Sequence, residues 1–314
     1  MFLKFLARRL LYVFPMLFIT TLIVFSLILL IPGDPTLALL GDNATPEKIA
    51  QLRQQLGLDR NIFIQYFDWL RNAVQGDLGR SIFTGQYVHE AVTTRLSVTI
   101  QLVVFALILS ILGGLFFAVL SIAYPNRWID YVARFFGTFG SAIPNFWLGL
   151  ILVLIFSLTF GWFPATGFTS FFENPVQFLH GIFLPAFCLA TAGTAQITRH
   201  LRSSLLEVMS ADYVRTAYSK GVNRWYAIFK HGLQNAMLPV ITTIGILFGN
   251  LLGSTVVIET IFAIPGMGQL AVNSILQRDF TMLQGVVLVM IVMIILINLI
   301  TDIVYAALDP RIEY

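Results

Sequence analysis

The sequence predicts an all-α protein that crosses a membrane several times. Of its 314 residues, 57% are hydrophobic and only 11% are charged, whereas a soluble domain usually carries about a quarter charged residues. The mean hydropathy is +0.82, and the apolar stretches leave no polar stretch long enough for a sizeable soluble core. The single cysteine, Cys188, lies inside an apolar stretch. It excludes an intrachain disulfide framework and is expected to be a packed small residue.

Six stretches are apolar enough to cross the membrane, since a helix of about 20 residues spans about 30 Å of hydrocarbon. The first runs from Leu10 to Ile31 and the second from about Ser97 to Tyr124. The other four lie between Arg134 and Trp162, between Gly181 and Gln196, between Asn235 and Ile258, and between Thr281 and Ala307. The fourth is short, so its helix is expected to continue past Arg199. A tight turn is expected at Pro125 and Asn126, after the second stretch.

The distribution of Lys and Arg predicts the orientation, because cytoplasmic connections collect positive charge. With both termini in the cytoplasm, the outer side has Arg278 and the basic residues of one loop of about 60 residues, which is long enough to escape this bias. The short outer connection 161–180 has no Lys or Arg. The chain is therefore divided into residues 1–32 with the first span, an outer loop 33–96, and a core 97–314.

The outer loop is expected to fold into two short amphipathic helices. Thr45 is a helix cap followed by Pro46, and Gly57 ends this helix. A second helix runs from Asn61 to Gly76, with Ile62, Tyr66, Trp69 and Val74 spaced as one apolar stripe. The loop is either a folded cap or a surface on which a partner docks, and both interpretations stay open.

A basic amphipathic segment, "DYVRTAYSKGVNRWYAIFKHGLQNAMLPV", interrupts the apolar chain from Asp212 to Val240. Tyr213, Val214, Ala217 and Tyr218 share one helical face, and Arg215, Ser219 and Lys220 share the other. Gly221 is expected to break the helix with a positive φ, and Asn223 to cap a second helix. Amphipathicity alone favours a loop lying on anionic headgroups, whereas the elbow shape suits a soluble partner that pushes on it.

Motifs along the whole chain resemble the permeases of ABC importers for dipeptides, oligopeptides, glutathione and nickel. The resemblance rests on "DYVRTAYSKGV" and "KHGLQNAMLPV" in the elbow and on "FLARRLLYVFPML", "IPGDP", "QLGLD", "GDLGRS", "ETIFAIPGMGQL", "RDF" and "ALDPRI" elsewhere. It implies the type I ABC importer permease fold, with six transmembrane helices and a cytoplasmic coupling helix at about 211–233. It also implies a bacterial inner-membrane location.

The resemblance assigns a role to the elbow, because in such permeases the coupling helix fits a groove on an ATPase subunit. Ala217 and Gly221 occupy the alanine and glycine places of the permease signature, while Arg215 and Thr216 stand where the superfamily favours Glu and Ala. The residues expected to couple to the ATPase are Tyr213, Arg215, Ala217, Gly221, Asn223, His231 and Asn235. The implied partners are a second homologous permease, two ATPase subunits, an extracytoplasmic binding protein and membrane lipid, with no nucleic acid.

The sequence contains no recognisable motif for nucleotide binding, metal binding or catalysis. It lacks the G-x-x-x-x-G-K-[ST] phosphate loop, so ATP and Mg are expected on the ATPase subunits and this chain is not expected to be an enzyme. The four histidines are not at metal-ligand spacing, and His231 is expected to pack or to lie at an interface. No catalytic residue and no metal site are expected.

Two acidic residues are candidates for the pathway or its gate, because charge inside a membrane is costly and commonly functional. Asp302 lies about two turns from the end of the sixth span, where structural pairing is the favoured interpretation. Glu259 lies near the outer end of the fifth span, before a turn at "IPGMG".

A secondary transporter or channel is the alternative from another class, although no internal repeat is visible. An intramembrane hydrolase would need Ser and His or paired Asp at membrane depth. By the resemblance, peptides lead as substrate, with nickel or a metal chelate second.

Overall fold

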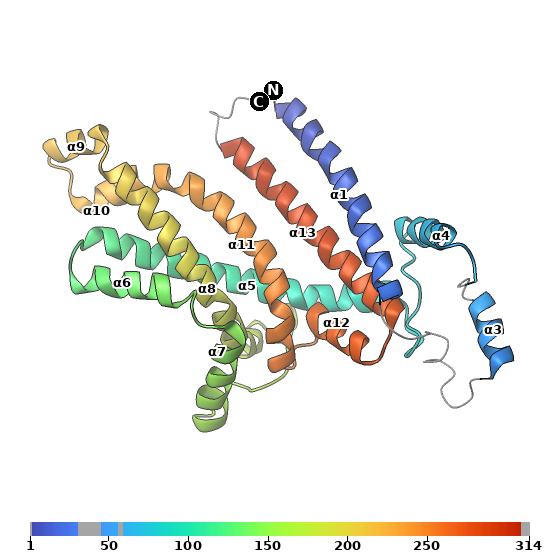
Figure 1. Ribbon diagram of the computed structural model, residues 1–314. Coiled ribbons are helices and arrows are strands. Elements are labelled where there is room, and N and C mark those ends of the chain that lie inside the picture. Colours follow the sequence, from blue (N-terminus) through green and yellow to red (C-terminus); the bar gives the residue numbers. More distant parts are fainter. Residues whose placement is uncertain (1, 31–44, 56–58, 309–314) are drawn as a thin grey trace. The chain divides into compact units, whose positions relative to one another are not determined.

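The computed structural model describes residues 2–30, 45–55 and 59–308 (Figure 1). The regular elements of these ranges are helices, and an isolated β-bridge joins Arg80 to Tyr87. The chain forms two compact units. The first consists mainly of Thr99–Ile264 and Leu296–Tyr314, and the second of Leu3–Val98 and Pro265–Ile295.

The first unit contains the greater part of the helical core. Its elements are α5 (Val88–Ala123, from Thr99 onward), α6 (Trp128–Phe139), α7 (Asn145–Leu152), the π-helical η2 (Val153–Thr159), α8 (Pro175–Met209), α9 (Asp212–Ser219), α10 (Arg224–Tyr226), the π-helical η3 (Ala227–Gly232), α11 (Leu233–Ile261) and the end of α13 (Phe280–Leu308). Most expected spans are confirmed. The helix of the fourth does continue past Arg199, to Met209, and Asn126 forms the expected turn with a φ of 58°.

The third expected span is wrong as a single helix. α6 ends at Phe139 and α7 begins only at Asn145, after Pro144. Proline has no backbone N–H to donate and disfavours a helical conformation of the residue before it, which breaks the helix here. Arg134 lies inside α6, and the part of the expected span that remains helical and apolar begins at Asn145. The apolar helix that remains in this region is Asn145–Thr159, which is shorter than a full span. Among the described residues, five helices are long and apolar enough to cross a membrane: Arg8–Ser26, Val88–Ala123, Pro175–Met209, Arg224–Ile261 and Phe280–Val304.

Helices of the first unit approach one another closely at glycines of α8 and α5. A Cβ added at Gly193 of α8 would lie 2.5 Å from Ser110 Oγ of α5 and 2.9 Å from Leu247 Cδ2 of α11. A Cβ at Gly114 of α5 would lie 2.4 Å from Ile197 Cγ2 of α8. Helices in lipid gain little from burying apolar surface against each other, so association depends on such close van der Waals packing.

The second unit contains α1 (Phe2–Leu30), α3 (Pro46–Gln55), α4 (Ile62–Val74), α12 (Met267–Leu276), and the first turns of α5 and α13. The expected starts of both outer helices are confirmed. Thr45 Oγ1 accepts from the Lys48 N–H at 3.4 Å, and Asn61 Oδ1 accepts from the Phe63 N–H at 2.9 Å. The predicted stop at Gly57 lies outside the described residues.

The apolar stripe of α4 is narrower than its spacing predicts. Tyr66 is buried and its hydroxyl lies 2.9 Å from Thr21 Oγ1 of α1, with the Phe25 ring at 5.5 Å. Ile62 and Val74, expected in the same stripe, are 41% and 81% exposed. The stripe is therefore centred on Tyr66, because the contact with α1 covers only the middle of α4.

Two distant motifs of the second unit meet around one carboxylate. Ser81 of "GDLGRS" donates its hydroxyl to Asp279 of "RDF", and the Met282 N–H donates to Asp279 Oδ1 at 3.1 Å. Asp279 thus caps the first turn of α13 and holds the loop before α5 at the same time. Beside it, Val88, Met267 and Val286 form part of a buried cluster.

We expect Gly193→Ala to lower the free energy of unfolding by about 2 kcal/mol, because the added methyl overpacks the contact of α8 with α5 and α11. Gly253→Ala is the matched control, since no atom lies within 4 Å of a Cβ at this position of α11 and alanine favours a helix more than glycine does. Thermal unfolding of the detergent-purified protein measures both. Equal stability of the two variants would contradict the close-packing interpretation.

Candidate functional site

The elbow, residues 211–233, consists of two short arms joined by a turn, and we define it by this range. Its first arm, α9, buries Val214 completely and leaves Ala217 half-buried. Tyr213 and Tyr218 were expected on the same apolar face, yet they are 48% and 38% exposed. The buried face is thus narrower than predicted, and the two tyrosines belong to the accessible surface of the isolated chain.

The turn of the elbow is a Schellman motif. The Gly221 N–H donates to the Tyr218 carbonyl at 2.9 Å, and the Val222 N–H donates to the Ala217 carbonyl at 3.2 Å. Gly221 has a φ of +84°, as predicted from its place after the helix. A side chain with a Cβ is strained in this region, whereas glycine is not. The direction in which the chain leaves α9 is therefore set by one residue.

The second arm is fastened to the end of α5. Asn223 caps α10 as predicted, since its Oδ1 accepts from the Tyr226 N–H at 2.8 Å. The Arg224 guanidinium donates twice to the Ile122 carbonyl, from Nη2 at 2.7 Å and from Nε at 3.1 Å. The Trp225 ring meets Tyr124 edge to face at 6.0 Å. Arg224 thus ties the elbow to α5.

Three of the predicted coupling residues lie together where the elbow enters α11. Asn235 Nδ2 donates to the His231 carbonyl at 2.9 Å and to the Tyr213 hydroxyl at 3.3 Å. The His231 ring meets Tyr226 edge to face at 6.2 Å and is half-buried. These contacts link α9 to the start of α11, and His231 packs as expected.

Arg215 has a different environment. Its guanidinium lies 3.6 Å from the Asp212 carboxylate, and the two side chains are 74% and 97% exposed. An ion pair this exposed contributes little to stability, because water and salt screen it. The charge of Arg215 is therefore available to a partner.

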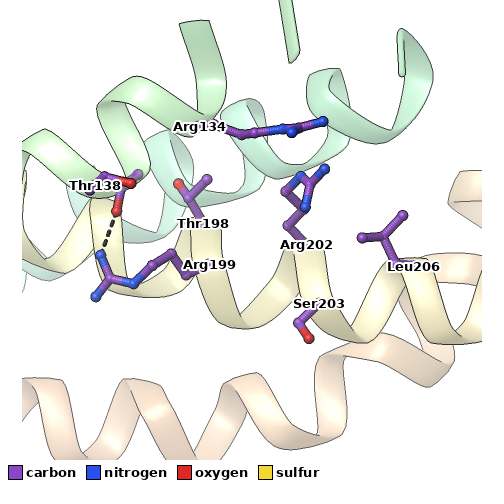
Figure 2. A pocket seen from close by; sticks show the side chains of 8 residues that line it. Arg134, Thr138, Thr198, Arg199, Arg202, Ser203 and Leu206 are labelled. Atoms are coloured by element: carbon purple, nitrogen blue, oxygen red, sulfur yellow. Dashed lines mark hydrogen bonds between the residues drawn. The ribbon is translucent and has the colours of Figure 1, made fainter. Parts of the chain in front are cut away.

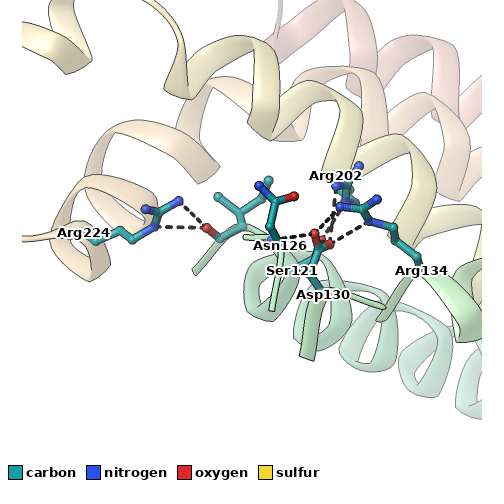
Figure 3. A network of polar contacts seen from close by, with 7 residues as sticks. Ser121, Asn126, Asp130, Arg134, Arg202 and Arg224 are labelled. Carbon is teal, nitrogen blue, oxygen red and sulfur yellow. Dashed lines mark hydrogen bonds and ion pairs between the residues drawn. The ribbon is translucent and has the colours of Figure 1, made fainter. Parts of the chain in front are cut away.

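A buried ionic network at the α5–α6 turn adjoins the elbow (Figure 3). Asp130 of α6, with a side chain 1% exposed, pairs with Arg134 of the same helix and lies 3.4 Å from Arg202 Nη2 of α8. Ser121 of α5 donates to Asp130 and accepts from Arg202 Nε at 2.6 Å. The Asn126 N–H donates to Asp130 Oδ2 at 3.2 Å. One carboxylate thus joins α5, α6 and α8.

The network keeps Asp130 ionised. Burial by itself acts to raise its pKa, but the hydrogen bonds from Arg134, Ser121 and the Asn126 backbone, together with the charge of Arg202, outweigh burial and hold the pKa well below its usual range. Asp130 was not among the candidate residues predicted from the sequence. Its spacing of four residues from Arg134 on one helix was a signal, but the partners on α5 and α8 are 9 and 72 residues away.

The two acidic candidates inside the spans have different environments. Glu259 of α11 is fully buried, and its Oε1 accepts from Thr99 Oγ1 of α5 at 2.6 Å. Asp302 of α13 is half-buried. The gate role of either residue stays a prediction. Among the described residues, no three His, Cys, Asp or Glu side chains cluster as metal ligands do.

Comparison with known proteins identifies related chains. A family model described as "binding-protein-dependent transport system inner membrane component" matches residues 110–314, and the corresponding N-terminal model matches residues 2–103. An oligopeptide transport system permease protein of Bacillus subtilis is 41% identical over 98% of both chains. A glutathione transport system permease protein of Escherichia coli is 37% identical over 99% of both. A dipeptide transport system permease protein of Alkalihalophilus pseudofirmus is 37% identical over 98% of both.

Solved structures share the fold at low identity. A methionine ABC transporter chain in an inward-facing conformation aligns with a TM-score of 0.58 and 16% identity, covering 69% of this chain and 96% of that one. A chain of an amino acid ABC transporter aligns with a TM-score of 0.51 and 17% identity, covering 71% and 94%. The helical core is thus that of a type I ABC importer permease.

We expect Asp130→Asn to lower the free energy of unfolding by about 2 kcal/mol at pH 7. The neutral amide removes the buried negative charge that accepts several hydrogen bonds, and these donors lose their charged acceptor. Since the pKa of Asp130 is lowered in the folded protein, this stabilisation is complete above the unfolded pKa of about 3.9 and is lost as the pH falls through the folded pKa. The stability difference between wild type and variant should therefore stay constant from about pH 8 to pH 5 and shrink below about pH 4.

The control is Asp212→Asn, which removes a carboxylate that is 97% exposed and should leave stability unchanged. Thermal unfolding in detergent across this pH range measures both variants. A difference that grows on acidification would contradict the assigned direction of the pKa.

Proposed function

Because the chain belongs to the family of binding-protein-dependent transport system inner membrane components, we propose that the elbow is the surface through which separate ATPase subunits drive it. The chain forms half of a membrane pathway, and a second homologous permease forms the other half. Two ATPase subunits hydrolyse ATP with Mg, and an extracytoplasmic binding protein delivers the solute. The elbow geometry is the observation that carries this proposal.

The exposed residues of the elbow suit a contact with a soluble protein. Tyr213, Tyr218 and Trp225 present exposed aromatic surface. Arg215 adds a positive charge that is only weakly paired with the exposed carboxylate of Asp212. Tyrosine, tryptophan and arginine contribute most to binding energy at protein interfaces. Val214, buried underneath, keeps this surface attached to the core of the chain.

The elbow transmits displacement because it is fastened to several helices. Arg224 holds it to the last turn of α5. Gly232 lies close to Leu205 of α8, since a Cβ there would be 3.1 Å from Leu205 Cδ2. The chain then runs directly into α11. A push on α9 is therefore carried into α5, α8 and α11 together, as a change between inward and outward opening of the pathway requires.

Peptides are the substrate class that we infer. The related permeases are named for oligopeptides, dipeptides and glutathione, which share a peptide backbone, and these names favour peptides over the nickel alternative. Isothermal titration of the cognate binding protein with short peptides, glutathione and nickel salts would test this directly.

The elbow lies in the cytoplasm if both termini do, as the distribution of Lys and Arg predicts. In a background without Cys188, a cysteine at Phe172, whose side chain is 85% exposed, should react with a membrane-impermeant maleimide added outside intact cells. A cysteine at Ser219 should react only after the membrane is opened. The reverse pattern would overturn the orientation and the proposed contact with ATPase subunits.

Gly221→Val should abolish most transport without changing membrane abundance. A β-branched residue at a φ of +84° is strained by about 1–2 kcal/mol, so the Schellman turn opens and the arms change their angle. Ala217→Trp should act in the same direction by crowding the surface. Copurification of the ATPase subunits and their binding-protein-stimulated ATP hydrolysis are the measurements.

Lys220→Gln is the control for the coupling test, since it changes a neighbouring exposed residue without altering the turn. It should keep at least about half of the transport, as single exposed charges at interface rims contribute little. If Gly221→Val and Ala217→Trp both retained full transport, the elbow would be a membrane-surface loop and the proposed coupling would be wrong.

A further inference from the structure

A second basic feature lies between α6 and α8, apart from the exposed surface of the elbow. A pocket of about 260 Å³ is lined by Arg134, Gly137, Thr138, Thr198, Arg199, Arg202, Ser203 and Leu206. Figure 2 shows Arg134 on α6 and both Arg199 and Arg202 on α8 around this space. Every charged residue of the lining is an arginine.

The pocket has a surplus of positive charge. Arg134 and Arg202 share one carboxylate, that of Asp130, whose side chain is 1% exposed and lies behind them. Arg199 does not pair with this carboxylate. Its Nη1 donates to the Gly137 carbonyl and, at 2.9 Å, to Ser141 Oγ. Three arginines therefore line the pocket and have one carboxylate between them, which leaves a net charge of about +2 for a ligand.

The lining chemistry suits a phosphate group. Planar guanidinium groups donate two parallel hydrogen bonds to phosphate oxygens, and two hydroxyl residues, Thr138 of α6 and Ser203 of α8, are also part of the lining. The hydrogen bonds of Arg199 to Gly137 of α6 and to Ser141, just beyond the end of α6, hold its guanidinium beside the pocket before any ligand arrives. Such preorganisation lowers the entropy that binding costs.

The residues around the pocket are typical of the level in the membrane at which lipid headgroups lie. The fourth apolar stretch ends at Gln196, and Arg199 and Arg202 follow within two turns of α8. On α6, the aromatic side chains of Trp128, Tyr131 and Phe135 are 73%, 60% and 52% exposed. Exposed aromatic residues beside arginines are typical of the membrane–water interface.

We propose that this α6–α8 pocket binds the phosphate of an anionic phospholipid headgroup, with Arg199 and Arg202 as its principal donors and Arg134 at its edge. Basic pockets between membrane helices on the cytoplasmic side are a recurring form of anionic lipid site. The positive-inside rule assigns this end of α8 to that side. The bound phosphate neutralises charge next to the Asp130 network, so the lipid stabilises the α5–α6–α8 junction.

Native mass spectrometry of the purified full chain tests the proposal, with dioleoyl phosphatidylglycerol and dioleoyl phosphatidylcholine as probes. Wild type should retain phosphatidylglycerol at least about tenfold more strongly than phosphatidylcholine, since each nearby Arg adds about a factor of five for an anionic headgroup. Arg199→Gln should reduce this preference about fivefold, and Arg199→Lys should restore part of it because the charge returns without the planar fork. Ser203→Trp should block the pocket with all three arginines present.

Arg127→Gln is the matched control, because Arg127 is an exposed cation just before α6 that does not line the pocket. It should keep the wild-type preference for phosphatidylglycerol. Equal losses in Arg127→Gln and Arg199→Gln would overturn the site, since they would reveal only a general surface charge. A preference unchanged by both Arg199→Gln and Ser203→Trp would overturn it as well.

Two further measurements distinguish a bound phospholipid from other occupants of the pocket. If excess inorganic phosphate displaces phosphatidylglycerol, the pocket is a site for free phosphate and the lipid assignment fails. If Arg199→Gln lowers copurification of the ATPase subunits while lipid retention stays at the wild-type level, the pocket is a protein contact and the proposal is wrong. Retained copurification together with lost lipid selectivity would support the lipid site and would leave the coupling role of the elbow standing.

Discussion

The buried carboxylate of Asp130 is the interaction on which the junction beside the elbow depends. Taking a charge out of water is costly, and the cost is offset only where several donors converge. Here the donors come from α5, from the turn at Asn126, from α6 and from α8. The ends of three helices are therefore held by one group. Arg224 fastens the elbow to Ile122, the residue next to Ser121, so the elbow is attached directly to this junction.

Away from this junction, contact between helices depends on small residues rather than on charge. Gly193 and Gly114 let α8 approach α5 and α11 to distances that no side chain would permit. In lipid such contacts replace the hydrophobic effect as the source of helix association. Specific polar contacts add to this packing, as where Thr99 Oγ1 of α5 donates to Glu259 of α11. A rigid core of this kind passes on a displacement at its edge instead of absorbing it.

The elbow combines a fixed conformation with an exposed surface. The Schellman turn at Gly221 and the cap at Asn223 are local features that set the angle between its arms. Its attachments to the core, through Arg224 and the Tyr213–Asn235–His231 contacts, join the elbow to α5 and α11, and Val214 is buried beneath it. The basic pocket of α6 and α8 shares Arg134 and Arg202 with the Asp130 network. A lipid phosphate there and a protein partner at the elbow would both act on the same junction.

The sequence by itself determined what depends on local chemistry. Apolar length predicted most of the spans, Gly221 and Asn223 predicted the turn and cap of the elbow, and Asn61 and Thr45 predicted the outer helix starts, because each follows from residues within one or two turns. Only the tertiary structure decided which distant groups meet. Asp279 accepts a hydrogen bond from Ser81, which is 198 residues away in the sequence, and Arg224 donates to the Ile122 carbonyl. Ile62 and Val74 have the spacing of an apolar stripe but remain exposed, because α1 covers only the middle of α4. Periodicity describes a helix face, but burial and pairing depend on which neighbour packs against it, and that information is not local.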